Sequence, residues 1–259
     1  VSAEAAKYAV PNEYDKMVSS LGAKRTNAYT SHERTVYMND IPVNEFEKWL
    51  KMESERFSKL VLRLFHTELE TVYEEFNMGQ DDDSRRAHYA LLGGLFPNHP
   101  YGTQTTIGKA EHLKNPSMVN IHKYWNTYYV PDNMAICLSG DINPEQTIQM
   151  IDTHFGNFKP GNRPRLNLPE EKPIDGPVVK EVYGPNYERV SLAYRFDGVN
   201  SRDQILVTLV DMILNNAAAG LIDLDLVQKQ KVIKAGCTPT FMKDYGYHQF
   251  YGIPRDGQT

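Results

Sequence analysis

Several features that mark common classes of protein are missing from this chain of 259 residues. No block of Lys and Arg occurs and the formal net charge is −5, so the basic surface expected of a nucleic-acid-binding protein is absent. The apolar runs are far shorter than the roughly 20 residues that a membrane-spanning helix needs. We therefore predict no nucleic-acid partner and no membrane span.

Motifs for complete catalytic centres are also missing. None of the eight histidines stands four residues from another, so neither H-E-x-x-H nor H-x-x-E-H occurs. The sequence has no G-x-S-x-G turn to present a nucleophilic serine and no glycine-rich loop to hold phosphates. This chain by itself is therefore not expected to assemble a complete active site of any common type.

Cysteine is scarce, with two residues in the whole chain. Cys137 and Cys237 each lie in an apolar stretch typical of a strand, where a buried free thiol is the simplest expectation. Two isolated cysteines do not define a disulfide. The cellular compartment therefore stays open.

What the sequence does contain is an alternation of helix and strand patterns. Amphipathic spacing predicts helices over 45–57, 67–78 and 86–95. Typical helix starts are Asn143-Pro144 and the pair Ser201 and Gln204. Short strands are predicted from apolar and β-branched residues in the segments 26–41, 133–142, 177–184, 189–198, 234–243 and 247–254.

The order of these patterns predicts an α+β fold in two parts. Residues 159–177 are rich in proline and glycine and are predicted to be a linker between subdomains at 1–158 and 178–259. The irregular succession of strands and helices favours mixed or antiparallel sheets flanked by helices over a doubly wound parallel sheet. Because the chain opens without a Met and closes just after a strand pattern, we expect a fragment of a longer protein.

The segment ELETVYEEF, residues 68–76, places two carboxylates on one side of a predicted helix. Seven residues advance an α-helix by about 700°, so Glu68 and Glu75 lie on one stripe, roughly 10 Å apart. Two carboxylates at that distance do not share one metal ion directly, but one can bind it while the other supports the site. From the spacing alone, a helix face in contact with water is the simpler alternative.

Four motifs in order make the chain resemble the pitrilysin/insulinase family of zinc metallopeptidases, which includes the mitochondrial processing peptidases. They are TNAYTSHERTVYMNDIP from residue 26, ELETVYEEF from residue 68, HPYGTQTTIGKAEHL from residue 99 and YYVPDNMAICLSGDI from residue 128. The resemblance covers nearly the whole chain. It implies two similar subdomains of the processing-peptidase type and a position in the N-terminal half of such an enzyme.

The resemblance implies a zinc site that this chain contains only in part. Glu75 matches the family's third zinc ligand, with Glu74 as the alternative if the register is shifted by one. Glu68 matches an acid that orients the metal or its histidine ligands. The family's H-x-x-E-H segment, with both histidine ligands and the general base, would precede Val1 and lies outside this chain.

The resemblance also implies a substrate-binding edge strand formed by Asn27, Ala28, Tyr29 and Thr30. An extended peptide would add to this edge as a further strand, and Asn27 would contact it near the scissile bond. An ordinary exposed strand is the alternative for this segment.

The function implied by the resemblance is hydrolysis of peptides or unfolded polypeptides by a zinc metalloendopeptidase. The zinc would polarise the scissile carbonyl and activate a water whose proton the missing base takes. We expect the fragment alone to be inactive and without zinc, and to need a second half-domain or partner chain. The alternatives are a non-catalytic structural subunit of the same family and a peptide-binding module.

Overall fold

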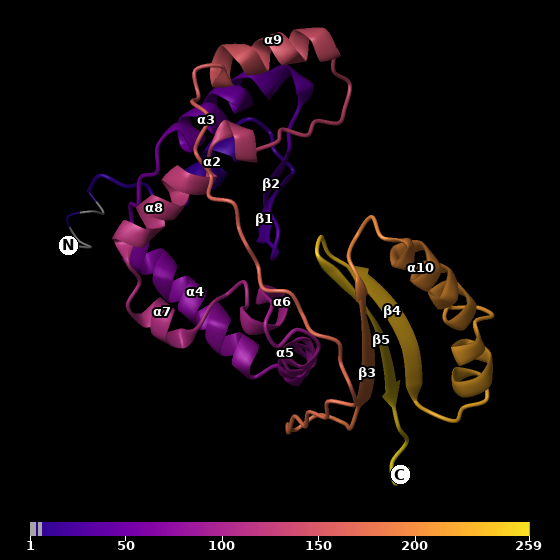
Figure 1. The fold of residues 1–259 in the computed structure, drawn as a ribbon. Coiled ribbons are helices and arrows are strands. Elements are labelled where there is room, and N and C mark those ends of the chain that lie inside the picture. The colour runs from indigo at the N-terminus through magenta and orange to yellow at the C-terminus, as the bar shows by residue number, and fades with distance from the viewer. Residues whose placement is uncertain (1–3, 5–6, 259) are drawn as a thin grey trace. The chain divides into compact units, whose positions relative to one another are not determined.

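The computed structural model describes residue 4 and residues 7–258, which fall into two compact units (Figure 1). Unit 1 comprises Val1–Phe76 and Ile107–Asn167, and unit 2 comprises Asn77–Thr106 and Leu168–Thr259. The sheets are antiparallel and stand among helices, which confirms the predicted α+β class. The predicted subdomains differ from these units, because residues 77–106 pack with the second part of the chain. A division at 159–177 therefore stays a prediction.

Unit 1 surrounds a two-stranded hairpin with helices. Its elements are α2 (Glu13–Ser20), β1 (Arg25–Thr30), β2 (Thr35–Asp40), η1 (Val43–Glu45), α3 (Phe46–Ser58), α4 (Phe65–Gln80), α7 (Ala110–Lys114), α8 (Met118–Tyr128), η2 (Pro131–Asn133) and α9 (Pro144–Phe155). The end of α4, from Asn77 onward, belongs to unit 2. The hairpin pairs Asn27 with Met38 in antiparallel register, so the predicted strands over 26–41 are confirmed.

Helix α3 supplies much of the core of unit 1, as its amphipathic spacing predicts. Phe46 and Leu50 are buried on one stripe, and α3 packs against α9. The side chain of Asn143 caps α9 by accepting a hydrogen bond from the Gln146 N–H. The predicted helix start at Asn143 is therefore confirmed.

A buried acid on α3 holds the hairpin in place. Glu53 is 4% exposed and accepts a hydrogen bond of 2.8 Å from the Tyr14 hydroxyl. Asn39 of β2 donates to the same hydroxyl at 2.8 Å, and Arg56 pairs with Glu53. Burial and the neighbouring Glu53 carboxylate raise the pKa of Tyr14 to about 12. The network joins α2, β2 and α3, so β1 is carried on a fixed support.

Unit 2 is a three-stranded antiparallel sheet with helices on both faces. Its elements are α5 (Asp83–Leu95), α6 (Pro100–Thr103), β3 (Val190–Asp197), α10 (Arg202–Leu214), the π-helical turn η3 (Asp223–Val227), β4 (Lys234–Phe241) and β5 (Tyr245–Ile253). The strand order is β3-β5-β4. Side chains alternate along β5, so Tyr247 joins the buried cluster with Leu92 and Leu95 of α5, while His248 faces α10.

Two predicted strands are absent from the structure. Residues 133–142 and 177–184 form no strand, and most of their side chains are exposed. An apolar, β-branched sequence forms a strand only where a neighbouring strand accepts its backbone hydrogen bonds, and no strand of the described residues pairs with either segment. The prediction that Cys137 is buried in a strand is wrong for the same reason, whereas Cys237 is buried in β4 as predicted.

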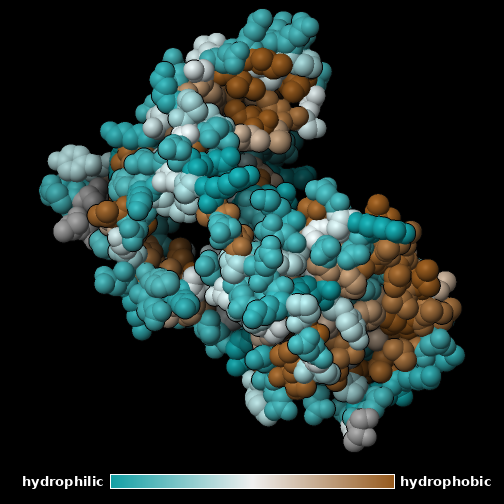
Figure 2. Space-filling view, in the orientation of Figure 1, coloured by the Kyte–Doolittle hydropathy of each residue, from teal (hydrophilic) through white to brown (hydrophobic). Residues whose placement is uncertain are grey.

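Helix α10 is apolar on its outer side as well as toward the sheet. Figure 2 shows hydrophobic side chains gathered over this helix, and the residues that contribute include Ile205, Leu209 and Ile213, all exposed. Within residue 4 and residues 7–258, no helix combines the length and the apolar character that crossing a membrane requires.

Candidate functional site

The two acids singled out by the sequence lie on the exposed side of α4. The apolar residues Leu69, Val72 and Phe76 form its half-buried stripe, and the helix extends unbroken through both acids. Glu68 and Glu75 therefore share one side of the helix, as their spacing predicts. Both are exposed, and neither carboxylate has a hydrogen bond or an ion pair with a described residue.

Zinc at Glu75 is the metal that the family resemblance implies, and the residues of this chain do not complete a site for it. A glutamate carboxylate is a suitable ligand, but zinc in proteins takes three or four protein ligands. Among the described residues, no group of three His, Cys, Asp or Glu side chains in ligating reach of one another includes Glu68 or Glu75. One carboxylate on an exposed helix face does not hold zinc by itself.

Glu74, the alternative ligand, faces a different part of the surface. It borders a hollow of about 250 Å³ between α4 and α7. The lining of this hollow is Leu69, Glu70, Tyr73, Glu74, Leu113 and Lys114. Glu75 does not line this hollow, so the adjacent acids Glu74 and Glu75 have different surroundings.

The hairpin presents β1 as a strand with one partner. All six residues of β1 are exposed, and no strand among the described residues pairs with its second edge. Ser31 N–H donates to the Arg34 carbonyl, which sets the alternation so that Ala28 N–H points away from β2. That N–H donates instead to Oδ1 of Asn27 at 2.9 Å. Among the described residues, the segment 27–30 therefore lies on a sheet edge without a second strand partner, and its use by a substrate stays a prediction.

The HPYG motif has a structural role in unit 2. His99 is 1% exposed, and its Nδ1 accepts a hydrogen bond of 3.3 Å from the Tyr101 N–H, capping α6. Its Nε2 lies 3.5 Å from the Asp244 carboxylate. Pro100 occupies the first helical turn, where its missing N–H costs nothing.

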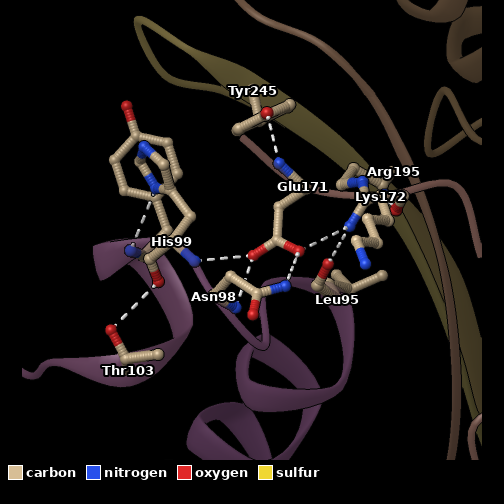
Figure 3. A network of polar contacts seen from close by, with 9 residues as sticks. Leu95, Asn98, His99, Thr103, Glu171, Lys172, Arg195 and Tyr245 are labelled. Carbon is tan, nitrogen blue, oxygen red and sulfur yellow. Dashed lines mark hydrogen bonds and ion pairs between the residues drawn. The ribbon is translucent and has the colours of Figure 1, made fainter. Parts of the chain in front are cut away.

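Glu171 ties this motif to the sheet (Figure 3). Its carboxylate accepts hydrogen bonds from the N–H groups of Asn98 and His99 at 2.7 and 2.6 Å, and lies 3.5 Å from Arg195 of β3. Its own N–H donates to the Tyr245 hydroxyl at 2.9 Å. Burial pushes the pKa of the Glu171 carboxyl up, but the donated hydrogen bonds and the Arg195 charge outweigh burial and leave this pKa below its ordinary value.

One polar cluster was not predicted from the sequence. Asp211, Cys237 and His248 come from α10, β4 and β5, and their donor atoms all lie within 4.8 Å of one another. From the sequence alone, Cys237 is expected to be an ordinary buried thiol and His248 an isolated histidine. The available signal was Asp211, an acid one turn beyond the buried Val207 on the sheet-facing side of an apolar helix.

Comparison with known proteins identifies the family. The family described as "Peptidase M16 inactive domain" matches residues 119–259, and the chain belongs to it. This confirms the predicted membership in the pitrilysin-type peptidases. The chain is 25% identical to zinc protease PqqE of Helicobacter pylori over 227 residues, which cover 85% of this chain and 51% of that protein. The chain thus spans about half the length of this relative.

Solved structures agree on the fold. A protease from Helicobacter pylori matches with a TM-score of 0.77 at 23% identity, covering 94% of this chain and 60% of that one. Pitrilysin matches with a TM-score of 0.70 at 16% identity, covering 93% of this chain and 27% of that one. Likeness at these identities establishes the fold and leaves the chemistry to the residues of the site.

Proposed function

We propose that this chain is part of the N-terminal half of a zinc metalloendopeptidase that hydrolyses peptides or unfolded polypeptides. The observation that carries the proposal is Glu75 of α4, an exposed acid whose carboxylate has no partner among the described residues, in a chain of this family. An exposed carboxylate contributes little to the stability of the fold. Glu75 can therefore bind a metal without a rearrangement of α4. The similarity to a protein named as a zinc protease supports the same activity.

In this proposal the chain supplies one ligand and one supporting acid. Glu75 binds the zinc, and Glu68, two turns earlier on the same side, steadies the ligand set. The remaining ligands and the general base belong to residues outside this sequence. The chain alone is then inactive and holds no stoichiometric zinc at Glu75.

The free edge of β1 supports the choice of substrate. An added strand pairs through backbone N–H and C=O groups, which every peptide carries, so recognition depends on an extended backbone more than on side chains. To pair at Ala28, the substrate carbonyl takes the place of the Asn27 amide on the Ala28 N–H. Folded proteins do not offer a free extended segment, so unfolded polypeptides are the fitting class.

The proposal is tested in the full-length parent protein with an unstructured peptide as substrate. We expect chelator-sensitive cleavage that Glu75→Gln abolishes and Glu74→Gln, the adjacent acid, leaves near the wild-type level. Loss of activity in Glu74→Gln alone would move the ligand by one residue. Peptide binding that persists with chelator, without any cleavage, would instead identify a peptide-binding module.

A further inference from the structure

The Asp211, Cys237 and His248 cluster is assembled by the fold of unit 2. Cys237 stands opposite Phe250 in the β4–β5 register, and His248, two residues from Phe250, therefore points to the same face of the sheet. Asp211 reaches that face from α10, where its Oδ1 lies 2.8 Å from Nε2 of His248. The Asn215 side chain donates to the Cys237 carbonyl at 2.9 Å and fixes the end of α10 on β4.

The cluster is buried, with one member reaching the surface. Cys237 is 1% and His248 is 3% exposed, whereas the Asp211 side chain is 17% exposed. Asp211 is therefore the member of the cluster in contact with solvent, while the thiol and the imidazole are shielded from it. Buried polar groups of this kind need partners to offset the loss of hydration.

The basic side chain beside Asp211 is His248, and neither a lysine nor an arginine among the described residues balances the negative charge at the cluster. Among the described residues, no ion pair joins Asp211 or Asp223 to a Lys or Arg, and the buried Oδ2 of Asp223 has no hydrogen-bond partner. A cation at the cluster would offset this negative charge.

The donor set selects the kind of cation. One sulfur, one imidazole nitrogen and one carboxylate oxygen are typical ligands of zinc, whereas calcium and magnesium take oxygen ligands. Tetrahedral zinc with ordinary bond lengths separates its ligand atoms by about 3.3–3.6 Å. The separation of 2.8 Å between Asp211 Oδ1 and His248 Nε2 is shorter than that value, and all the donor atoms lie within 4.8 Å of one another, so binding requires small shifts that include moving Asp211 and His248 apart.

We propose that Asp211, Cys237 and His248 bind one zinc ion, which fastens α10 to the sheet of unit 2. Binding replaces the S–H bond of Cys237 by a sulfur–metal bond and releases the proton to solvent. No oxidant or reductant is involved. The site stands independently of the peptidase proposal, because it uses no residue of α4 or β1.

Cobalt provides the test, because its absorption reports thiolate ligation. Metal-free chain is titrated with Co²⁺ under reducing conditions at about 100 µM protein, well above a Kd of about 1 µM. We expect a thiolate-to-cobalt charge-transfer band that saturates at one equivalent and that Zn²⁺ removes. Cys237→Ser should abolish the band, and Asp211→Asn should weaken binding by about 10-fold or more.

Matched controls separate this site from other ligands. Cys137→Ser removes the exposed cysteine of unit 1 and should leave the band unchanged, and so should Glu75→Gln. The proposal would be overturned if Cys137→Ser removed the band, if the titration did not saturate at one equivalent, or if no charge-transfer band appeared.

A second measurement needs no variant and so does not depend on the folding of Cys237→Ser. X-ray absorption at the zinc edge of the loaded wild-type chain should show one sulfur at about 2.3 Å with nitrogen and oxygen neighbours. Zinc should also raise the Tm of the wild-type chain by about 5 °C at about 100 times Kd. A zinc environment without sulfur would rule the site out.

Discussion

The acids of α4 and the acids of unit 2 differ in what surrounds them. Glu68 and Glu75 are exposed, and their carboxylates have no partner among the described residues. Glu171 is 1% exposed at its side chain and has three hydrogen-bond donors and an arginine around it. A sequence motif singles out the first pair, and no motif singles out the second acid. An exposed acid whose side chain has no partners is therefore the better candidate for a catalytic or metal-binding role. A buried acid with several hydrogen bonds instead stabilises the fold.

The largest expected effect is on activity at α4. Glu75→Gln in the full-length protein should lower kcat/KM by about 1000-fold or more, because a bound metal supplies several kcal/mol of transition-state stabilisation. Glu68→Gln should cost about 10–100-fold. Urea unfolding should change by less than about 0.5 kcal/mol in both variants, as for exposed sites in general. A large loss of stability in Glu75→Gln would mean that this acid also stabilises the fold.

Glu171→Gln should show the opposite behaviour. The substitution removes the charge that Arg195 and the backbone N–H groups face, and breaking such a buried set costs about 3 kcal/mol of unfolding free energy. Urea unfolding of the chain measures this. The neighbouring exposed Glu170→Gln is the matched control and should stay within about 0.5 kcal/mol of wild type.

The two cysteines offer a smaller contrast of the same kind. Cys137 is exposed, while Cys237 is buried. Burial, the hydrogen bond to Asp211 and the charges of Asp211 and Asp223 raise the pKa of the Cys237 thiol to about 12. A thiol reagent on metal-free protein near neutral pH should modify Cys137 at least about 100-fold faster, since the thiolate reacts. Peptide mapping after timed quenching identifies the modified residue. Equal rates in the folded chain would mean that the sheet around Cys237 opens readily.

Acid should weaken unit 2 through Glu171. Its folded pKa lies below the ordinary value of 4.5, so its contribution to stability is complete above that pH and is lost as the pH falls below it. Unfolding free energies between about pH 5 and pH 3 should therefore fall less steeply in Glu171→Gln than in wild type. If the unfolding free energies of the two proteins fell in parallel with pH, Glu171 would not be the group responsible for the loss of stability in acid.

The smallest effect concerns Asn27. If its amide contacts the substrate, Asn27→Ala should lower kcat/KM of the full-length protein by about 5–10-fold, the equivalent of one hydrogen bond. Asn44→Ala, at an exposed residue of η1, serves as the control. An increase in activity would mean that Asn27 only competes with the substrate for the Ala28 N–H.

Local patterns predicted the parts of the fold that local physics builds. The capping side chain of Asn143, the apolar stripe of α3 and the hairpin at 26–41 all follow from contacts between residues close in sequence. The strands predicted over 133–142 and 177–184 failed because a strand needs a distant partner. Their apolar composition carries no information about whether that partner is present.

The candidate sites divide in the same way. The α4 acids were found because helical geometry alone relates residues seven apart, and the family resemblance then gave them roles. The Asp211, Cys237 and His248 cluster joins residues 26 and 11 positions apart in the chain, in three elements. Spacing in the sequence does not report which helix side covers which sheet face.

By itself the sequence determined the class of fold, the family and the helix side on which Glu68 and Glu75 lie, since each depends on residue order and on short-range geometry. Only the tertiary structure decided which acids are buried and which are free, and only it brought a thiol, an imidazole and a carboxylate together beneath α10. The physical reason is that burial and ligation arise between surfaces that meet after folding.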